Sequence, residues 1–227
     1  MYKTHVKTIL ERRNAVNGRL YLEDPTILGW SLINEPRCET WKVANCVSYL
    51  QKWLEEMAAY VKSIDSRHLL TIGEEGFFAA NSPRVAANPA DWAPLMGQNF
   101  SGNHMIPEID FATVHVWPDN WNKYVVVQAM MTVDAHLCTT CIAHIDASRC
   151  HNVDLCHRVP HSYTYEFFSE WINAHVEDTM HLLRKPMVMT EFGRKLYTKD
   201  RKREIVETRD PVFNMAYRIF HENLERY

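Results

Sequence analysis

The amino-acid sequence predicts an α/β fold in which parallel strands alternate with helices. Four short apolar runs have the length and residue types of buried parallel strands. Longer segments with apolar residues at helical spacing lie between them. Because strands joined by helices run parallel, this alternation indicates a parallel sheet with helical crossovers. No internal repeat or low-complexity linker is visible, so residues 1–227 are expected to form one domain.

Local patterns place the individual elements. The apolar residues of the first segment follow helical spacing until Gly18 ends the pattern. A short helix near 89–96 is predicted because Asn88 is a good N-cap and Pro89 suits a first turn. In chain order we expect a helix at about 2–16, a strand at 27–33, a helix at 46–64, a strand at 68–73, the short helix, a strand at 109–115, a helix at about 163–183, a strand at 186–191 and a helix at about 210–225.

Composition and charge narrow the possible partners. The net charge is -3, and the one basic cluster, at 199–203, is interrupted by Asp200. A solvated surface is therefore expected there, and no nucleic-acid partner. Apolar runs stay shorter than the roughly 18 residues of a membrane span, so no membrane association is expected. The first residues have the pattern of a mid-helix segment and not of a signal peptide, which suggests an incomplete sequence.

Two glutamates, Glu35 and Glu191, each end one of the apolar runs and are followed by the breakers Pro36 and Gly193. Each carboxylate is therefore expected where a strand gives way to a loop. In a (β/α)8 barrel, the carboxyl ends of the strands form the catalytic face. Since we count four strands and not eight, the predicted fold is a partial (β/α)8 TIM barrel. Enzymatic cleavage of a glycosidic bond typically requires two carboxyl groups on one face, and this arrangement would supply them.

The cysteines raise separate questions. The stretch at about 125–162 has no clear period and contains five histidines together with Cys138, Cys141, Cys150 and Cys156. It could form a zinc site, although its spacing matches no common finger, or disulfides, or it could be an insertion without defined structure. Cys38 and Cys46 lie on either side of a short loop and could form a disulfide if the geometry permits.

Several segments together carry a family resemblance. Residues 33–38 read Ile-Asn-Glu-Pro-Arg-Cys, and matching segments follow in order at 71–77, 109–119 and 185–193. With these motifs the chain resembles glycoside hydrolase family 5, specifically its endo-β-1,4-mannanases of plant or fungal type. The resemblance covers nearly the whole chain except about 125–162. It implies strands four to seven of a larger barrel, without the early-strand arginine and the eighth-strand tryptophan of the family pattern.

The resemblance assigns roles to four residues around the expected catalytic centre. Glu35 matches the acid/base, and Glu191 matches the nucleophile. Asn34 matches a residue that bonds the 2-hydroxyl of the sugar. His115 matches a histidine that lines the site. From the sequence alone, the alternative is a structural histidine at a strand end whose hydrogen bonds are satisfied within the fold.

Four further residues are expected to bind substrate: Arg37, Glu75, Trp117 and Trp121. Arg37 could instead pair with a local carboxylate, and Glu75 could be structural. The two tryptophans lie on a predicted loop, where exposed rings suit stacking on sugar faces; loop packing is the alternative. At position 117 the family pattern has a tyrosine that bonds the nucleophile. An indole can donate a hydrogen bond but cannot accept one, which puts the tuning of Glu191 in doubt.

The chemistry implied by the resemblance needs one protonated and one ionised carboxyl group. A retaining mechanism requires about 5 Å between them, and more than about 6.5 Å would favour inversion. We expect the pKa of Glu35 to be raised by partial burial and by the negative charge of Glu191.

The sequence therefore predicts an endo-acting glycoside hydrolase that cleaves internal β-1,4-mannosidic bonds by retaining double displacement. The expected partner is β-mannan or galactomannan, with no cofactor and no metal. One alternative is a catalytically incompetent fragment or relic that at most binds polysaccharide. Another is a related β-1,4-glucanase, because Asn-Glu-Pro is shared among related hydrolases. The resemblance also implies a secreted, extracellular protein, and the isolated chain is expected to fold poorly.

Overall fold

The structure, a computed structural model, describes residues 1–117, 121, 161–193 and 206–225. These residues belong to two compact units. The first unit contains Met1–Val116 and Asn173–Phe192, and the second contains Trp117–Ile172 and Gly193–Tyr227. Cys138, Cys141, Cys150 and Cys156 lie outside the described residues, so all three interpretations of that segment stay open.

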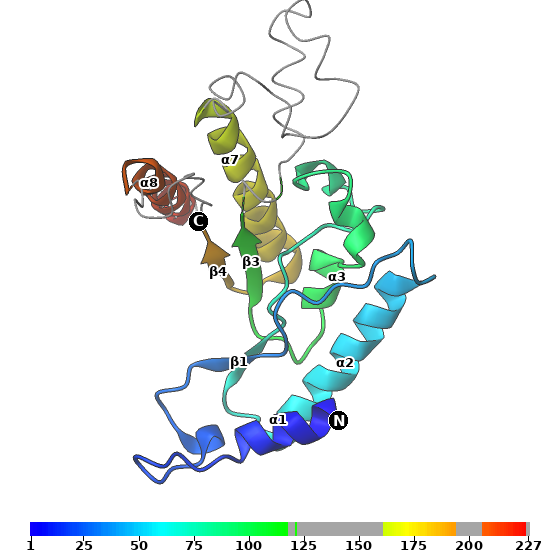
Figure 1. Cartoon of the computed structure of the whole chain (residues 1–227), viewed down its shortest axis with the longest axis vertical. Helices are drawn as coiled ribbons and strands as arrows, with labels where there is room; N and C mark the ends of the chain where they lie inside the picture. Colours follow the sequence, from blue (N-terminus) through cyan, green and yellow to red (C-terminus); the bar gives the residue numbers. More distant parts are fainter. Residues whose placement is uncertain (118–120, 122–160, 194–205, 226–227) are drawn as a thin grey trace, which may run out of the picture. The chain divides into compact units, whose positions relative to one another are not determined.

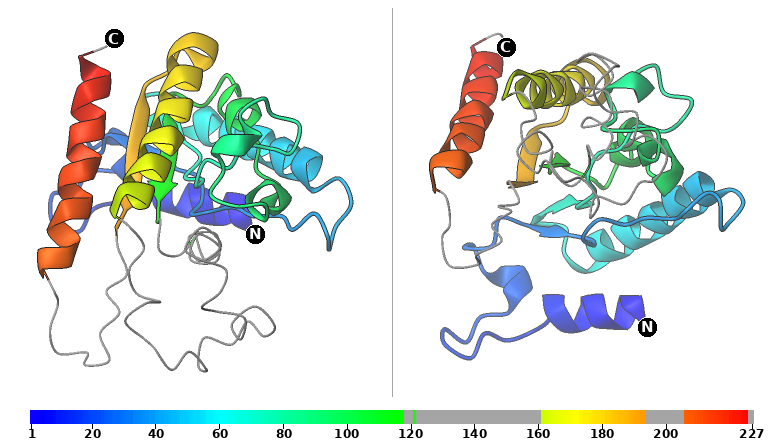
Figure 2. Two further views of the ribbon diagram at one scale, coloured as in Figure 1. Left: turned by 90° about the horizontal axis from the view of Figure 1, so that it is seen from above. Right: turned by 45° about the horizontal axis from the view of Figure 1, so that its top comes forward.

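Four parallel strands form the centre of the first unit (Figure 1): β1 (Gly29–Ser31), β2 (Leu69–Thr71), β3 (Ala112–Val116) and β4 (Met187–Phe192). β1 pairs with β2 and β3 pairs with β4, both in parallel. The left view of Figure 2 shows the paired strands β3 (green) and β4 (gold) side by side. All four predicted strands are confirmed, with bounds that differ by a few residues at their ends.

Single hydrogen bonds connect the two strand pairs. The backbone N–H of Asp110 donates to Leu70 O at 2.8 Å, and the Thr71 hydroxyl donates to Phe111 O at 2.8 Å. The Asp110 carboxylate also accepts the backbone N–H of Leu70 at 2.7 Å, which takes the place of one ladder bond. The four strands therefore follow one another in chain order, as in a partial (β/α)8 barrel, which confirms the predicted fold class.

The helices agree with the prediction in number and order for the long segments. They are α1 (Tyr2–Leu10), α2 (Cys46–Ile64), α7 (His161–Glu177), which continues as the π-helix η5 (Asp178–Leu183), and α8 (Val206–Leu224). Shorter turns are η1 (Tyr21–Glu23), η2 (Val85–Ala87), η3 (Ala93–Met96) and α3 (Phe100–His104). None of the helices in the described part of the chain is long and apolar enough to cross a bilayer.

Two helix predictions were wrong in detail. α1 ends at Leu10 and not near residue 16, because the backbone then turns back and Asn14 N–H bonds Arg19 O at 2.7 Å. The predicted helix at 89–96 is replaced by the 3₁₀ turn η3, and the short helix α3 follows it. Asn99 caps α3 by accepting the backbone N–H of Gly102, a local pattern that the sequence analysis missed.

The core of the first unit forms where α2 packs on the strands. The apolar positions of α2 recur at helical spacing, so they lie on one face that meets the side chains of the strand ends. The buried cluster comprises Leu10, Leu32, Leu50, Leu54, Met57, Ala58, Val61, Leu70, Ile72, Ile106 and Ile109. This packing fixes the strand ends that carry the candidate site.

Candidate active site

The backbone before Glu35 follows β2 beyond the end of β1. Ile33 N–H bonds Ile72 O at 3.1 Å, and Glu35 N–H bonds Gly73 O at 2.8 Å. Glu35 itself has φ +47°, in the left-handed region that a non-glycine residue adopts at a cost of about 1–3 kcal/mol. The side chain of Glu35 thus leaves the sheet at a bend in the backbone, and the hydrogen bonds to the β2 segment fix the position of this bend.

A bulge in the pairing of β3 and β4 sets the position of Glu191. The register is regular up to Val114 opposite Met189, and then His115 pairs with Glu191, which leaves Thr190 as the extra residue. Because side chains alternate along a strand, one extra residue exchanges the side chain that faces the partner position. The bulge therefore places Glu191, and not Thr190, opposite His115.

The side chains of Glu35, Glu191 and His115 converge. His115 Nδ1 lies 2.9 Å from Glu35 Oε1 and 3.6 Å from Glu191 Oε2. Since both neighbours are carboxylate oxygens, Nδ1 carries the proton and donates. One side-chain oxygen of each glutamate and the imidazole nitrogen all lie within 4.8 Å of one another. His115 is buried, whereas the Glu35 and Glu191 side chains are 28% and 34% exposed, so both carboxylates face solvent.

The pKa of Glu35 is lowered from its ordinary value, and the predicted rise was wrong. The largest cause is the hydrogen bond from His115, which stabilises the ionised carboxylate. Burial opposes this effect, and the positive charge of Arg37 adds to it. The prediction relied on partial burial and on the negative charge of Glu191; in the structure the hydrogen bond from His115 outweighs the burial.

Arg37 forms an ion pair with Glu75, whose side chain is fully buried. The alternative that Arg37 pairs with a local carboxylate is therefore observed, while its contact with substrate stays a prediction. Arg37 Nη2 also lies 3.5 Å from Glu35 Oε2. The guanidinium further lies over the rings of Phe77 and Trp92, at 5.8 and 5.9 Å from their centroids. Burial raises the pKa of Glu75, and its partners oppose that rise.

The remaining predicted residues lie in different surroundings. Asn34 is exposed next to Glu35, and its bond to a sugar hydroxyl stays a prediction. Trp117 is half-buried and packs so closely on Gly193 that a Cβ there would approach its ring to 2.6 Å. Trp121 is only 4% exposed and packs edge-on against Trp171, with ring centroids 5.6 Å apart. Of the two alternatives for Trp121, its burial favours packing over stacking on a sugar face.

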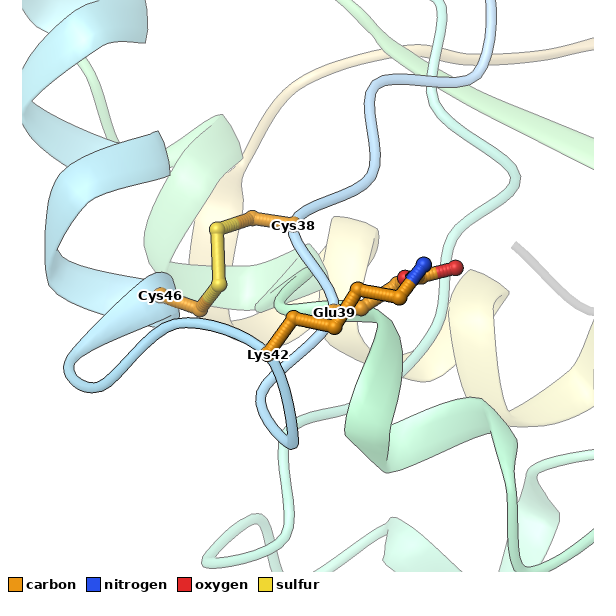
Figure 3. Close-up of a disulfide and its surroundings, with 4 residues drawn as sticks. All are labelled: Cys38, Glu39, Lys42 and Cys46. Atoms are coloured by element: carbon orange, nitrogen blue, oxygen red, sulfur yellow. Dashed lines mark ion pairs between the residues drawn. A yellow bond between two sulfur atoms is a disulfide. The ribbon is translucent and has the colours of Figure 1, made fainter.

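A disulfide closes the loop that follows the Asn34–Cys38 segment. Cys38 and Cys46 are bonded, with Cα atoms 5.3 Å apart, and an ion pair between Glu39 and Lys42 lies within the same loop (Figure 3). The possible pairing of these two cysteines is thereby confirmed. The disulfide joins the loop after β1 to the first residue of α2.

Two polar residues at the site were missed by the sequence analysis. Gln98 and Glu74 are both fully buried, Gln98 against Glu75 and Glu74 against Asn103. No sequence pattern marks a single glutamine in a loop as buried. The two adjacent glutamates after a predicted strand gave no such signal either, because alternation predicts one buried side chain and both are buried.

Comparisons with known proteins agree with this geometry. A family model described as glycoside hydrolase family 5 β-mannosidase-like matches residues 1–141. Mannan endo-1,4-β-mannosidase 1 of Arabidopsis thaliana is 38% identical over 223 residues, which cover 98% of this chain and 45% of that protein. The protein of the same name in Oryza sativa subsp. japonica is 37% identical over 227 residues, which cover 43% of that protein. This chain thus spans less than half the length of these two relatives.

Solved structures show the same fold. The endo-1,4-β-D-mannanase of Thermotoga petrophila RKU-1 superposes with a TM-score of 0.68 at 23% identity, over 98% of this chain and 50% of that one. The endo-1,4-β-mannanase of Rhizomucor miehei superposes with a TM-score of 0.58 at 28% identity, over 87% of this chain and 44% of that one. The motifs, the paired carboxylates and the family model agree, and the chain belongs to glycoside hydrolase family 5.

Proposed function

We propose that this chain carries the two catalytic carboxylates of an endo-acting glycoside hydrolase that cleaves internal β-1,4-mannosidic bonds with retention. The observation that supports it is the pair Glu35 and Glu191, whose oxygens lie within 4.8 Å of one another on either side of His115. This separation suits direct attack by a carboxylate and leaves too little room for the intervening water of an inverting enzyme.

In the proposed mechanism, Glu191 attacks the anomeric carbon while Glu35 gives a proton to the leaving oxygen. A glycosyl ester forms on Glu191 and the first sugar fragment departs. Glu35, now ionised, takes a proton from a water molecule that attacks the same carbon and releases the second fragment. Formation of the ester removes the negative charge of Glu191, so the surroundings of Glu35 change between the two steps.

Mannan or galactomannan is the proposed substrate. The support is the activity in the names of the relatives, which are mannan endo-1,4-β-mannosidases in both plants. Asn34 and Arg37 are the proposed contacts of the sugar near the two carboxylates. The Glu75 side chain is fully buried, which favours the structural alternative for this residue and not the expected contact with substrate. We also propose a secreted location, because a disulfide such as Cys38–Cys46 persists in oxidising compartments.

A second candidate function is polysaccharide binding without turnover. The lowered pKa of Glu35 favours it, because it reduces the fraction of Glu35 that is protonated and able to act as the acid in the first step. This candidate predicts retention of the chain by mannan, with no new reducing ends at any pH.

The test is hydrolysis of linear mannan, galactomannan and cellulose by the full chain, measured as new reducing ends between pH 4 and 8. Glu35→Gln and Glu191→Gln keep the side-chain shape and should each abolish hydrolysis, whereas Glu55→Gln, on the exposed face of α2, should not. Proton NMR of the first product should show the β-anomer. An initial α-anomer would refute the retaining mechanism, and equal activity of both site variants with the native chain would refute the proposed site.

A further inference from the structure

The side chain of Gln98 uses all of its hydrogen-bonding positions within the site. It is fully buried, and its Oε1 accepts the backbone N–H groups of Gly76 at 3.3 Å and Phe77 at 3.1 Å. Its Nε2 donates to Pro36 O at 3.1 Å and to the carboxylate of Glu75. A side-chain amide has two donor hydrogens and two acceptor lone pairs, so no position is left unused. Gln98 therefore joins the loop after β1 to the loop after β2.

The backbone that carries Gln98 is itself fixed against the loop after β1. Cys38 N–H donates to Met96 O at 2.8 Å. Gly97 has φ +79°, and a Cβ on it would collide with the carbonyl oxygen of Cys38. Glycine adopts this φ and this close approach at low cost, so the backbone at Gly97 can lie directly against the loop after β1. This contact holds the adjacent residue Gln98 at a defined position.

A continuous set of contacts runs from Gln98 to Glu35. Gln98 bonds one oxygen of Glu75, and the other oxygen of Glu75 bonds both Nε and Nη2 of Arg37. Nη2 of Arg37 then lies 3.5 Å from Glu35 Oε2. The hydrogen bond from Gln98 favours the ionised form of Glu75 against its burial, and ionised Glu75 attracts the guanidinium.

We propose that Gln98 is a positioning residue of the active site: through Glu75 it holds the guanidinium of Arg37 beside the acid/base Glu35. Its role in turnover rests on the proposed function, whereas its hold on Arg37 rests on the contacts alone. Without Gln98, Glu75 loses a donor, and the charge of Arg37 is no longer held at a fixed distance from Glu35. Gln98 thus helps to favour the ionised form of Glu35 without touching it.

A purely structural role for Gln98 makes a different prediction, and Asn88 provides the matched control. The Asn88 amide bonds the N–H and C=O of Phe78, at 2.9 and 2.8 Å, in the same loop but beyond Glu75. Gln98→Met and Asn88→Leu each remove an amide that ties this loop. Only Gln98→Met removes a bond to Glu75. A structural role predicts the same result for both variants.

The first readout is the pH dependence of kcat/KM on mannan. Arg37 lowers the pKa of Glu35, so its displacement should move the alkaline limb of the profile to higher pH, since turnover needs protonated Glu35. Gln98→Met should reproduce the shift caused by Arg37→Gln, and Asn88→Leu should leave the limb in place. In the Arg37→Gln background, Gln98→Met should change the profile less than twofold at any pH. A full additional shift in that background would overturn the proposal.

The second readout requires no turnover. In the full chain labelled with ¹⁵N-arginine, the Arg37 Nε–H should exchange slowly with water because it donates to buried Glu75. Its exchange should accelerate about tenfold or more in Gln98→Met and stay within twofold in Asn88→Leu. Equal acceleration in both variants would overturn the proposal. If the native chain is inactive on mannan but this difference is observed, the positioning by Gln98 stands while the proposed function fails.

Discussion

A buried carboxyl group beside the site leads to a prediction about stability. Asn103 Nδ2 donates to Glu74 Oε2 at 2.7 Å, while Glu74 Oε1 and Asn103 Oδ1 are buried acceptors without a partner among the described residues. If Glu74 were ionised, its Oε1 would be a buried charged oxygen without a hydrogen-bond donor in the described part of the chain, which is costly. His104 Nδ1 lies 3.3 Å from Glu74 Oε1, but its N–H donates to Phe100 O at 2.9 Å, and His104 Nε2 accepts Thr113 N–H. The arrangement therefore suits a neutral Glu74 next to a neutral His104.

The magnitude follows from the two pKa values. Burial raises the pKa of Glu74 from 4.5 to about 8 and lowers that of His104 from 6.5 to about 3. Between pH 4.5 and 8 the folded chain binds the Glu74 proton more tightly than the unfolded chain, so this stability is lost as pH rises. The His104 contribution is lost in the opposite direction, below pH 6.5. Above pH 6.5 only the Glu74 effect remains, and it amounts to roughly 2 kcal/mol by pH 8.

The assay is urea denaturation of the native chain and of Glu74→Gln at pH 6.5 and 8.5. The native chain should lose about 2 kcal/mol of unfolding free energy over this interval. The variant should lose much less, because glutamine stays neutral at both pH values and its side-chain oxygen can still accept the hydrogen bond from Asn103. Glu55→Gln, at an exposed position of α2, should behave like the native chain. Equal losses in the native chain and in Glu74→Gln would show that Glu74 does not cause this pH dependence. A cooperative transition would also contradict our expectation that the isolated chain folds poorly.

Three other outcomes follow from the site. Replacing Cys38 and Cys46 with serine should lower the unfolding free energy by about 2–3 kcal/mol in urea denaturation, because the disulfide closes a loop of eight positions. Gly97→Ala should cost about 1–3 kcal/mol in the same assay, since alanine is strained at φ +79° and meets the Cys38 carbonyl. His115→Ala should move the alkaline limb of kcat/KM to higher pH, because the pKa of Glu35 rises when its main hydrogen bond is lost. An unchanged limb would contradict the assignment of Glu35 as the acid.

Much of the fold could be predicted because the apolar pattern is local. The bounds predicted for α2 are the observed ones, since its apolar face is long and Asp65 accepts backbone N–H groups directly after it. The end of α1 and the segment 89–96 were not predictable in this way. Turn residues near Gly18 outweigh the helical spacing, and the 3₁₀ turn η3 is too short to show a period.

The residues of the site that belong to sequence motifs could be predicted. Glu35, Glu191 and His115 converge as expected from their positions at strand ends. The bulge at Thr190 was not predictable, because register depends on the neighbouring strand and not on the sequence of β4. For the same reason the pKa of Glu35 was predicted in the wrong direction. Its value depends on a 2.9 Å contact across 80 positions of sequence, which no local pattern encodes.

The lowered pKa of Glu35 affects the two steps of the proposed reaction in opposite ways. His115 and Arg37 stabilise the ionised form of the Glu35 carboxylate. The second step requires this ionised form as a base, whereas the first step requires the protonated form as an acid. His115 and Arg37 therefore reduce the fraction of Glu35 that is protonated at the start of the first step, and they favour the ionised form that the second step needs. If the proposed reaction occurs in this order, we predict that the ester on Glu191 does not accumulate. Rapid mixing with substrate should then show no burst of the first product, and a burst would contradict this prediction.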